Sequence, residues 1–366
     1  MNRDFSQLRA DQFHPLFAFE GIGYLFTEQF LAQYSKYEIV VVYENNFFRS
    51  FISKVGMEKT LQEGYDLFAN EEKFAENCKA WEAYLVRAKK VIETYQTPED
   101  DLTVEDWQLV TTTLRECWVY HDKTEFIFTD TAFLAQETNP VIAKSLKRLG
   151  EIKFPSSEVL HMLGLNVFYR VAEKIADQFD ITHQDIKFFS TKEVEELFSG
   201  KKPDMNRIAR RKNAYVLLGF DGVVTEPSAE VTALIVDEFR VKASDIKTLR
   251  GITASKGEVE GNVRVILADY GSDFRAVDEY VKAMQTGEIL VTENTTVQFW
   301  PVLQKASAII TNQGGLNSHA AIVAREMKIP CIVGVANATE ILKTGERVSL
   351  EALGREGVIT RVEETA

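Results

Sequence analysis

The stretch TNQGGLNSHAAIVAREMKIPCIVG, residues 311–334, places a histidine between a glycine pair and a helical pattern. The apolar residues before it, 308–310, are typical of a buried strand. After the histidine, apolar side chains recur with helical spacing at four positions: Ala320, Val323, Ala324 and Met327. Pro330 ends this helical pattern. The sequence therefore predicts a strand, a glycine-containing loop and a helix whose first turn carries His319.

This arrangement suits a histidine that accepts a phosphoryl group. The start of a helix offers unpaired N–H groups and a partial positive charge, and it readily binds anions. A neutral imidazole is a competent nucleophile near neutral pH. Five neighbours would supply close backbone approach, hydroxyl donors or a positive charge: Gly314, Gly315, Thr311, Ser318 and Arg325. We therefore interpret His319 as a candidate phosphoryl acceptor.

The residues alone leave other interpretations of His319 open. A lone histidine at a helix start is more often structural, with its ring satisfied by neighbours. A zinc site is disfavoured because no second histidine or cysteine lies nearby at ligand spacing. A nucleophilic Ser318 would be expected in a G-x-S-x-G turn, which this stretch lacks.

The composition argues against several classes of protein. The chain has 366 residues and a formal net charge of −13, which disfavours nonspecific binding to nucleic acid or anionic membranes. No apolar run is long enough for a membrane helix, and the N-terminus lacks the apolar core of a signal peptide. Cys78, Cys117 and Cys331 form neither a disulfide framework nor a metal-binding pair. We therefore expect a cytoplasmic protein with no metal site.

The hydrophobic period changes along the chain and predicts three parts. Residues 1–205 are interpreted as a mainly helical domain, in which a long helix begins after Asn70. Residues 206–250 are interpreted as a linker region that contains a hairpin and a helix. Residues 251–366 alternate short strands with helices, which is the pattern of an α/β domain.

Several shorter patterns refine this division. Thr103 and Ser190 each begin a capping-box pattern and so predict helix starts. Residues 38–43 form a β-branched run that could be a strand or a buried stretch of helix. Residues 201–213 are basic and polar and are interpreted as a solvated linker. Asp221 begins an Asp-Gly pair, which predicts a hairpin turn.

The last part is predicted in more detail. Strands are expected at six places: 259–267, 289–292, 308–311, 331–333, 347–350 and 358–361. Helices are expected at three: 274–285, 297–304 and 318–328.

Residues 314–334, GGLNSHAAIVAREMKIPCIVG, closely resemble the phosphohistidine motif of the phosphoenolpyruvate-utilising enzymes. That family includes phosphoenolpyruvate synthase, pyruvate phosphate dikinase, rifampicin phosphotransferase and enzyme I of the sugar phosphotransferase system. Asn317 stands where threonine or leucine is usual. The resemblance extends upstream through GITASKG at 251–257, and it covers about residues 250–362. Two further residues, Arg264 and Thr292, match motif positions without an assigned role.

The resemblance implies a fold and a role for this segment. Its relatives carry a swivelling β/β/α phosphohistidine domain on a hinge, which we expect near residues 240–255. His319 would take a phosphoryl group at one active site and deliver it at another. Gly314, Gly315 and Ser318 would shape the histidine loop. The expected fold class is therefore multidomain: a mainly helical N-terminal domain followed by the swivelling domain.

The resemblance also implies partners. The chain ends at Ala366, so we expect no phosphoenolpyruvate-binding (β/α)8 barrel, and the N-terminal part lacks the phosphate loop of an ATP-grasp domain. We expect ATP and Mg²⁺ to act through a partner ATP-grasp domain or subunit, with no cofactor tightly bound here. The chain would then be one component of a split transferase whose acceptor is a small molecule.

The acceptor site can only be sought among clustered polar residues. Candidates in the helical part are Tyr120, His121, Asp122 and Lys123. A solvated polar face is the preferred explanation of this cluster. An alternative function is a non-catalytic phosphocarrier whose helical domain docks another protein, and a third is a degenerate homologue kept for assembly.

Overall fold

The computed structural model describes residues 4–20, 22–98, 101–124, 126–240, 246–267, 275–295 and 299–362. The chain divides into two units. The helical unit comprises three segments: Met1–Phe13, Phe19–Thr124 and Thr131–Glu238. The barrel unit comprises three others: His14–Ala18, Glu125–Asp130 and Phe239–Ala366. Part of the predicted hinge, residues 241–245, lies outside the described residues.

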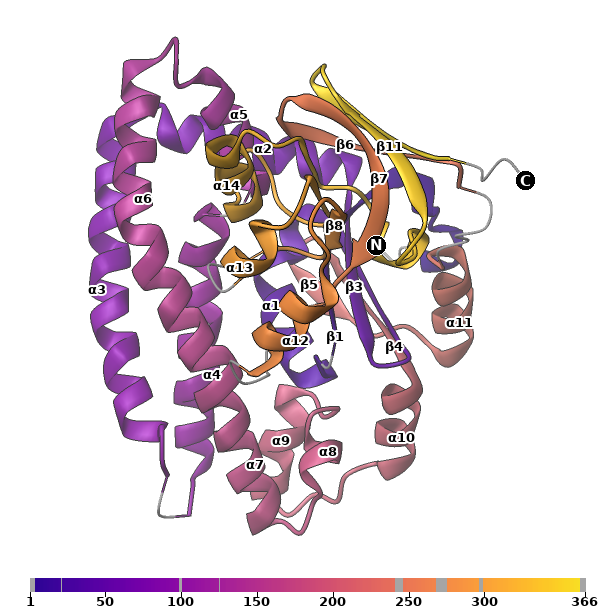
Figure 1. The fold of residues 1–366 in the computed structure, drawn as a ribbon. Coiled ribbons are helices and arrows are strands. Elements are labelled where there is room, and N and C mark those ends of the chain that lie inside the picture. Colours follow the sequence, from indigo (N-terminus) through magenta and orange to yellow (C-terminus); the bar gives the residue numbers. More distant parts are fainter. Residues whose placement is uncertain are drawn as a thin grey trace. The chain divides into compact units, whose positions relative to one another are not determined.

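Helices make up most of the helical unit (Figure 1). They are α1 (Tyr24–Tyr34), α2 (Lys54–Phe68), α3 (Glu71–Tyr95), α4 (Val104–His121), α6 (Pro140–Leu160), α7 (Phe168–Gln178), α8 (His183–Ile186), α9 (Thr191–Phe198), α10 (Met205–Asn213) and α11 (Ala229–Glu238). A π-helical turn, His161–Val167, joins α6 to α7. Helix α5 (Phe126–Ala135) begins among the residues of the barrel unit and ends among those of the helical unit. None of the described helices is both long and apolar enough to cross a membrane.

The predicted helix starts are confirmed by their caps. Asn70 accepts a hydrogen bond from the Lys73 amide at the start of α3. Thr103 and Ser190 each form a complete capping box, at the starts of α4 and α9. These side chains satisfy backbone donors that the first turn of a helix leaves unpaired.

Four strands of a five-stranded sheet also belong to the helical unit, whereas most residues of the sheet's first strand are assigned to the barrel unit. The strands of this sheet are β1 (Phe13–Glu20), β2 (Ile39–Glu44), β3 (Phe47–Ser53), β4 (Ala214–Phe220) and β5 (Val223–Thr225), in the order β1-β3-β2-β4-β5. Residues 38–43, left open as strand or helix, therefore contribute a strand. The predicted hairpin is also confirmed, because Asp221 and Gly222 have φ values of 52° and 79°, as a tight hairpin turn requires.

The interpretation of residues 206–250 as a linker is wrong for the hairpin. Strand β4 pairs along its length with β2, from Ile39 opposite Gly219 to Glu44 opposite Ala214, so the partners lie 170 to 180 positions apart. Its apolar side chains are buried between elements of the helical unit. Long-range pairing of this kind leaves no local signal in the sequence.

The basic run at 201–213 is also not a solvated linker, because most of it forms α10. Arg211 is 3% exposed, and its guanidinium lies 3.7 Å from the centre of the Tyr24 ring. It donates to Glu193 at 2.6 Å and to Glu226 at 2.6 and 3.0 Å. These carboxylates hold the pKa of Arg211 above its ordinary value despite burial of the guanidinium. One buried cation therefore joins α9, α10 and the chain after β5.

In the barrel unit, the described strands close into a barrel in the order β10-β6-β12-β11-β7-β8-β9. They are β6 (Thr248–Ser255), β7 (Gly257–Val265), β8 (Ile289–Thr292), β9 (Ala308–Thr311), β10 (Cys331–Val333), β11 (Arg347–Ala352) and β12 (Glu356–Arg361). The pairs β7–β8, β8–β9 and β9–β10 are parallel, and the others are antiparallel. The helices are α12 (Arg275–Ala283), α13 (Trp300–Leu303), α14 (His319–Met327) and α15 (Ala338–Ile341).

The six predicted strands are confirmed with shifts of a few residues at their ends, and β6 is an addition. The predicted helices correspond to α12, α13 and α14, although two predicted starts, Phe274 and Val297, lie outside the described residues. Local periodicity predicts these elements, but it carries no signal that the strands close into a barrel.

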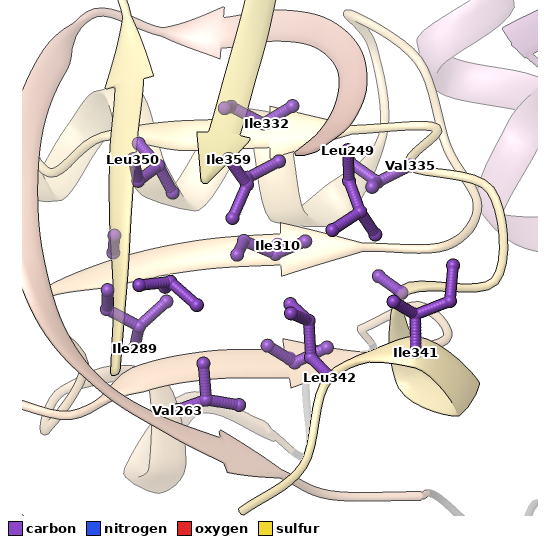
Figure 2. Packing of buried hydrophobic residues seen from close by; sticks show 14 of the residues in the cluster. Leu249, Val263, Ile289, Ile310, Ile332, Val335, Ile341, Leu342, Leu350 and Ile359 are labelled. Atoms are coloured by element: carbon purple, nitrogen blue, oxygen red, sulfur yellow. The ribbon is translucent and has the colours of Figure 1, made fainter. Parts of the chain in front are cut away.

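The barrel core depends on side chains that alternate along each strand. Ile289 of β8 points into the barrel, where it packs with Ile310 and Ile332 (Figure 2). Val291, two residues further along the strand, belongs to the same apolar cluster. Leu290, between them, belongs to a second apolar cluster under the helices. Because both faces of the parallel strands are covered, the sequences of these strands are continuous runs of apolar residues.

We predict that Arg211→Met destabilises the helical unit. Two carboxylates would lose their buried partner, which costs about 3–5 kcal/mol of the free energy of unfolding. Urea denaturation followed by tryptophan fluorescence measures this, since Trp81, Trp107 and Trp118 belong to the helical unit. Arg210→Met, on the exposed side of α10, is the matched control. Equal stabilities of the two variants would contradict the prediction.

Candidate functional site

The histidine loop, residues 312–318, begins where strand β9 ends. Strands β8 and β9 are parallel neighbours, and Thr292 lies opposite Thr311 at their carboxyl ends. In parallel sheets, loops at these ends commonly form ligand sites. This strand pairing therefore brings two loops together: the histidine loop and residues 293–295 after β8.

Backbone hydrogen bonds join the two loops. The Asn312 amide donates to the Thr292 carbonyl at 3.0 Å, and the Gln313 amide donates to the Glu293 carbonyl at 2.9 Å. The buried Thr311 hydroxyl donates to the Gln313 carbonyl at 2.6 Å. Thr311, predicted as a hydroxyl donor for an anion, therefore holds the loop backbone in this structure.

Gly314 turns the loop sharply. Its φ is +104°, a conformation that side chains other than glycine rarely adopt. A Cβ atom at this position would lie 3.0 Å from the side chain of Ser318. Gly315 has a different part, because its carbonyl accepts from the Ser318 amide at 3.0 Å and closes the turn before the helix.

Ser318 is the N-cap of α14, and His319 is the first residue of that helix. The Ser318 side chain accepts from the Ala321 amide at 3.4 Å. The helix is held in place by small and branched side chains packed against the outer face of the barrel strands: Ala320, Ala321, Val323 and Ala324. The histidine is half-buried and lies at the positive end of the helix.

Thr295 orients the imidazole. Its side-chain oxygen lies 2.9 Å from Nδ1 of His319, and Thr295 is 9% exposed. When Nδ1 carries the proton and donates to this oxygen, the lone pair resides on Nε2. The arrangement can therefore present Nε2 as a nucleophile. Sequence reasoning missed Thr295, although it lies only three residues beyond the motif position Thr292.

Arg325 lies behind the loop. Its Nη1 donates to the Leu316 carbonyl at 2.9 Å and to the Ala254 carbonyl at 3.2 Å. Burial lowers the pKa of the guanidinium. These two bonds tie the histidine loop to β6. In its described contacts Arg325 therefore holds the loop backbone, and its role as a positive charge beside an anion stays a prediction.

The two motif residues without an assigned role are structural in this fold. Arg264 binds the Glu288 carboxylate through two hydrogen bonds, at 2.7 and 3.0 Å. This pair links β7 to the start of β8. Thr292 donates to the Asn294 carbonyl at 3.2 Å and shapes the loop that carries Thr295.

The acceptor candidates of the helical unit do not form a solvated face, because Asp122 is buried and the other three are half-buried. Tyr120 stacks on the rings of Trp81 and Tyr84, with centroids 5.9 and 5.3 Å away. The His121 ring meets the edge of Trp118. Lys123 donates to the Val119 carbonyl.

Asp122 differs most from expectation, because it is 2% exposed and the preferred explanation was a solvated face. Gln33 donates to its Oδ2 at 3.2 Å, whereas Oδ1 has no hydrogen-bond partner among the described residues. The ammonium of Lys123 lies 3.9 Å from Oδ1. Burial raises the pKa of Asp122 and lowers that of Lys123. The role of these residues in acceptor binding stays a prediction.

Cysteines and metal-ligand groups add no second site among the described residues. No group of three or more His, Cys, Asp and Glu side chains there is arranged to hold a metal ion. Cys331 is fully buried in β10, and burial raises the pKa of its thiol to about 12. It therefore behaves as a core residue under α14.

Comparison with known proteins bears on this site. Residues 284–353, which include both loops and α14, match the family model "PEP-utilising enzyme, mobile domain". This segment is therefore similar to the mobile domain of PEP-utilising enzymes. The resemblance that the sequence motif indicated is thereby confirmed for the barrel unit.

The relatives extend beyond the segment. A probable phosphoenolpyruvate synthase of Methanothermobacter thermautotrophicus is 42% identical over 123 residues, which cover 34% of this chain and 16% of that protein. A rifampicin phosphotransferase of Bacillus cereus is 28% identical over 230 residues, which cover 61% of this chain and 25% of that protein. The phosphoenolpyruvate synthase of Aquifex aeolicus is 44% identical over 112 residues, 30% of this chain and 12% of that protein. The chain thus matches a quarter or less of each relative.

We predict that Gly314→Ala destabilises the barrel unit. A side chain at φ +104° is strained and would contact Ser318, so we expect a loss of about 1–3 kcal/mol. Hydrogen exchange of the β9 amides measures the loss. Gly354→Ala, at an exposed turn outside the left-handed region, is the control and should change exchange little. Unchanged protection in Gly354→Ala and Gly314→Ala alike would disprove the strain argument.

Proposed function

We propose that this chain is a phosphotransferase component in which His319 carries a phosphoryl group. The observation that carries this proposal is the histidine at the first position of α14, with Nδ1 held by Thr295 in a segment that matches a mobile domain. The relatives named phosphoenolpyruvate synthase and rifampicin phosphotransferase are transferases, which supports the same reaction class.

In the first half-reaction, the lone pair of Nε2 attacks a phosphorus atom of ATP. A P–N bond forms, the P–O bond to the leaving group breaks, and the leaving group departs with the electron pair. When Nδ1 carries the proton and donates to Thr295, the attacking nitrogen needs no separate base. We propose that ATP and Mg²⁺ are held by an ATP-grasp domain or subunit, since the N-terminal sequence lacks a glycine-rich phosphate loop.

The surroundings of His319 suit the charged intermediate. A helix start stabilises a nearby anion by about 0.3–1 kcal/mol, and by up to about 2 kcal/mol where it is partly buried. A gain of 1.4 kcal/mol is about tenfold in an equilibrium constant. The helix start alone therefore stabilises the phosphohistidine only modestly, and the fixed orientation of the ring is the main feature that favours phosphorylation.

In the second half-reaction, an acceptor oxygen attacks the phosphorus and the P–N bond breaks. Nε2 recovers its lone pair, and the proton of the acceptor hydroxyl passes to a base. We propose a small-molecule acceptor, delivery by movement of the barrel unit, and acceptor binding by the helical unit. The clustered Asp122 and Lys123 are its candidate polar groups. Label that stops at His319 without reaching any small molecule would favour the alternative, a non-catalytic phosphocarrier.

We predict that His319 is the phosphorylated residue. Incubation with phosphoramidate, and separately with ATP and a candidate ATP-grasp partner, should produce acid-labile, alkali-stable phosphate on the chain. His319→Ala should lose it. His161→Ala and His183→Ala, both at exposed histidines, are matched controls and should retain it. The proposal is falsified if His319→Ala is labelled as well as the parent chain.

We predict that Thr295→Val slows the loading of His319 by about 10- to 100-fold, because an unanchored ring loses the correct tautomer and orientation. The rate of phosphohistidine formation measures the effect, and ¹⁵N NMR of the imidazole reports the tautomer. Thr360→Val, at an exposed position of β12, is the control. A Thr295→Val protein with unchanged tautomer and rate would contradict the role of the threonine.

A further inference from the structure

A carboxylate from a distant segment binds the histidine loop within the barrel unit. The Leu316 amide donates to Oδ1 of Asp130 at 3.1 Å. Asp130 belongs to the segment Glu125–Asp130, which clusters with the barrel although it lies nearly two hundred residues earlier. It is 8% exposed, so the carboxylate is held in a largely desolvated place.

The other described loop contacts come from the barrel itself. Arg325 donates to the Leu316 carbonyl, and the Ser318 amide donates to the Gly315 carbonyl. The Leu316 amide, by contrast, donates to a carboxylate. A hydrogen bond from an amide to a carboxylate is charge-assisted and about twice as strong as a neutral one. Asp130 therefore accepts a hydrogen bond from an amide that could also donate to a phosphoryl oxygen.

The carboxylate is close enough to sense a charge on His319. His319 lies three positions after Leu316, so their Cα atoms lie within about 11 Å even in an extended chain. The turn closed by Ser318 and Gly315 makes the separation shorter. A phosphoryl group adds a charge of about −2, and burial of Asp130 reduces screening by solvent.

We propose that Asp130 is a positioning residue that latches the unphosphorylated histidine loop and releases it when His319 is phosphorylated. This inference rests on the proposed function of His319. Like charges weaken the bond from Leu316 to Asp130, and the freed amide then exchanges with solvent. Phosphorylation thereby shifts the loop from a latched state to an open state.

Coupling of this kind is reciprocal. If phosphorylation weakens the latch by some factor, the latch disfavours phosphorylation at equilibrium by the same factor. Couplings between sites commonly lie between about 5- and 150-fold. Removing the charge of Asp130 while keeping an acceptor oxygen should therefore raise the phosphorylated fraction of His319 at a fixed donor concentration.

The test compares amide exchange at Leu316 before and after phosphorylation with phosphoramidate, which needs no enzyme partner. In the wild type, we expect exchange of this amide to accelerate about tenfold on phosphorylation. In Asp130→Asn, we expect less than about twofold acceleration, because the amide oxygen accepts without charge. Asp130→Ala should exchange fast in both states. Asp221→Asn, at the exposed hairpin turn, should behave as the wild type.

The outcomes separate this inference from the proposed function. Phosphorylated His319 with unchanged Leu316 exchange in the wild type overturns the latch alone. The same acceleration in Asp130→Asn as in the wild type also overturns it. If phosphoramidate does not label His319 at all, both the latch and the phosphocarrier proposal fall. The wild-type comparison uses no variant, so it holds even if Asp130→Ala fails to fold.

Discussion

The hydrogen bond between Thr295 and Nδ1 of His319 is the contact on which the candidate chemistry depends. An imidazole at a helix start has two nitrogens and two neutral tautomers, and only one of them leaves Nε2 nucleophilic. Thr295 can hold the ring through Nδ1 because its loop and the histidine loop leave adjacent parallel strands. The register of Thr292 opposite Thr311 therefore decides the orientation of a side chain eight residues further on.

The same strands must be rigid for the ring to stay oriented. Strands β8 and β9 are buried on both faces, with Ile289 inside the barrel and Leu290 under the helices. Small residues on α14 bring that helix close to the strands. Arg325 joins the loop to β6 from behind, so the loop is tied on two sides while His319 remains half-buried. The strands that carry the site are therefore rigid, while His319 itself stays partly exposed.

Two charged side chains of the helical unit are buried although the sequence pattern indicates solvated ones. Arg211 was part of a run that looked solvated, yet it is enclosed by carboxylates and an aromatic ring. Asp122 was expected on a polar face and is almost fully buried. In both cases the sequence identifies a charged residue, but groups from segments far away in the chain surround that residue. Burial of a charged side chain depends on its partners, which local pattern does not reveal.

The sequence by itself determined the helix that carries His319, the glycine-containing loop before it and most strands of the barrel unit. These features depend on local spacing, capping and backbone freedom, which neighbouring residues specify. Only the tertiary structure decided that β4 joins β2, that the strands close into a barrel, and that Thr295 and Asp130 reach the histidine loop. Each of these contacts joins residues far apart in sequence, and its geometry depends on how whole elements pack.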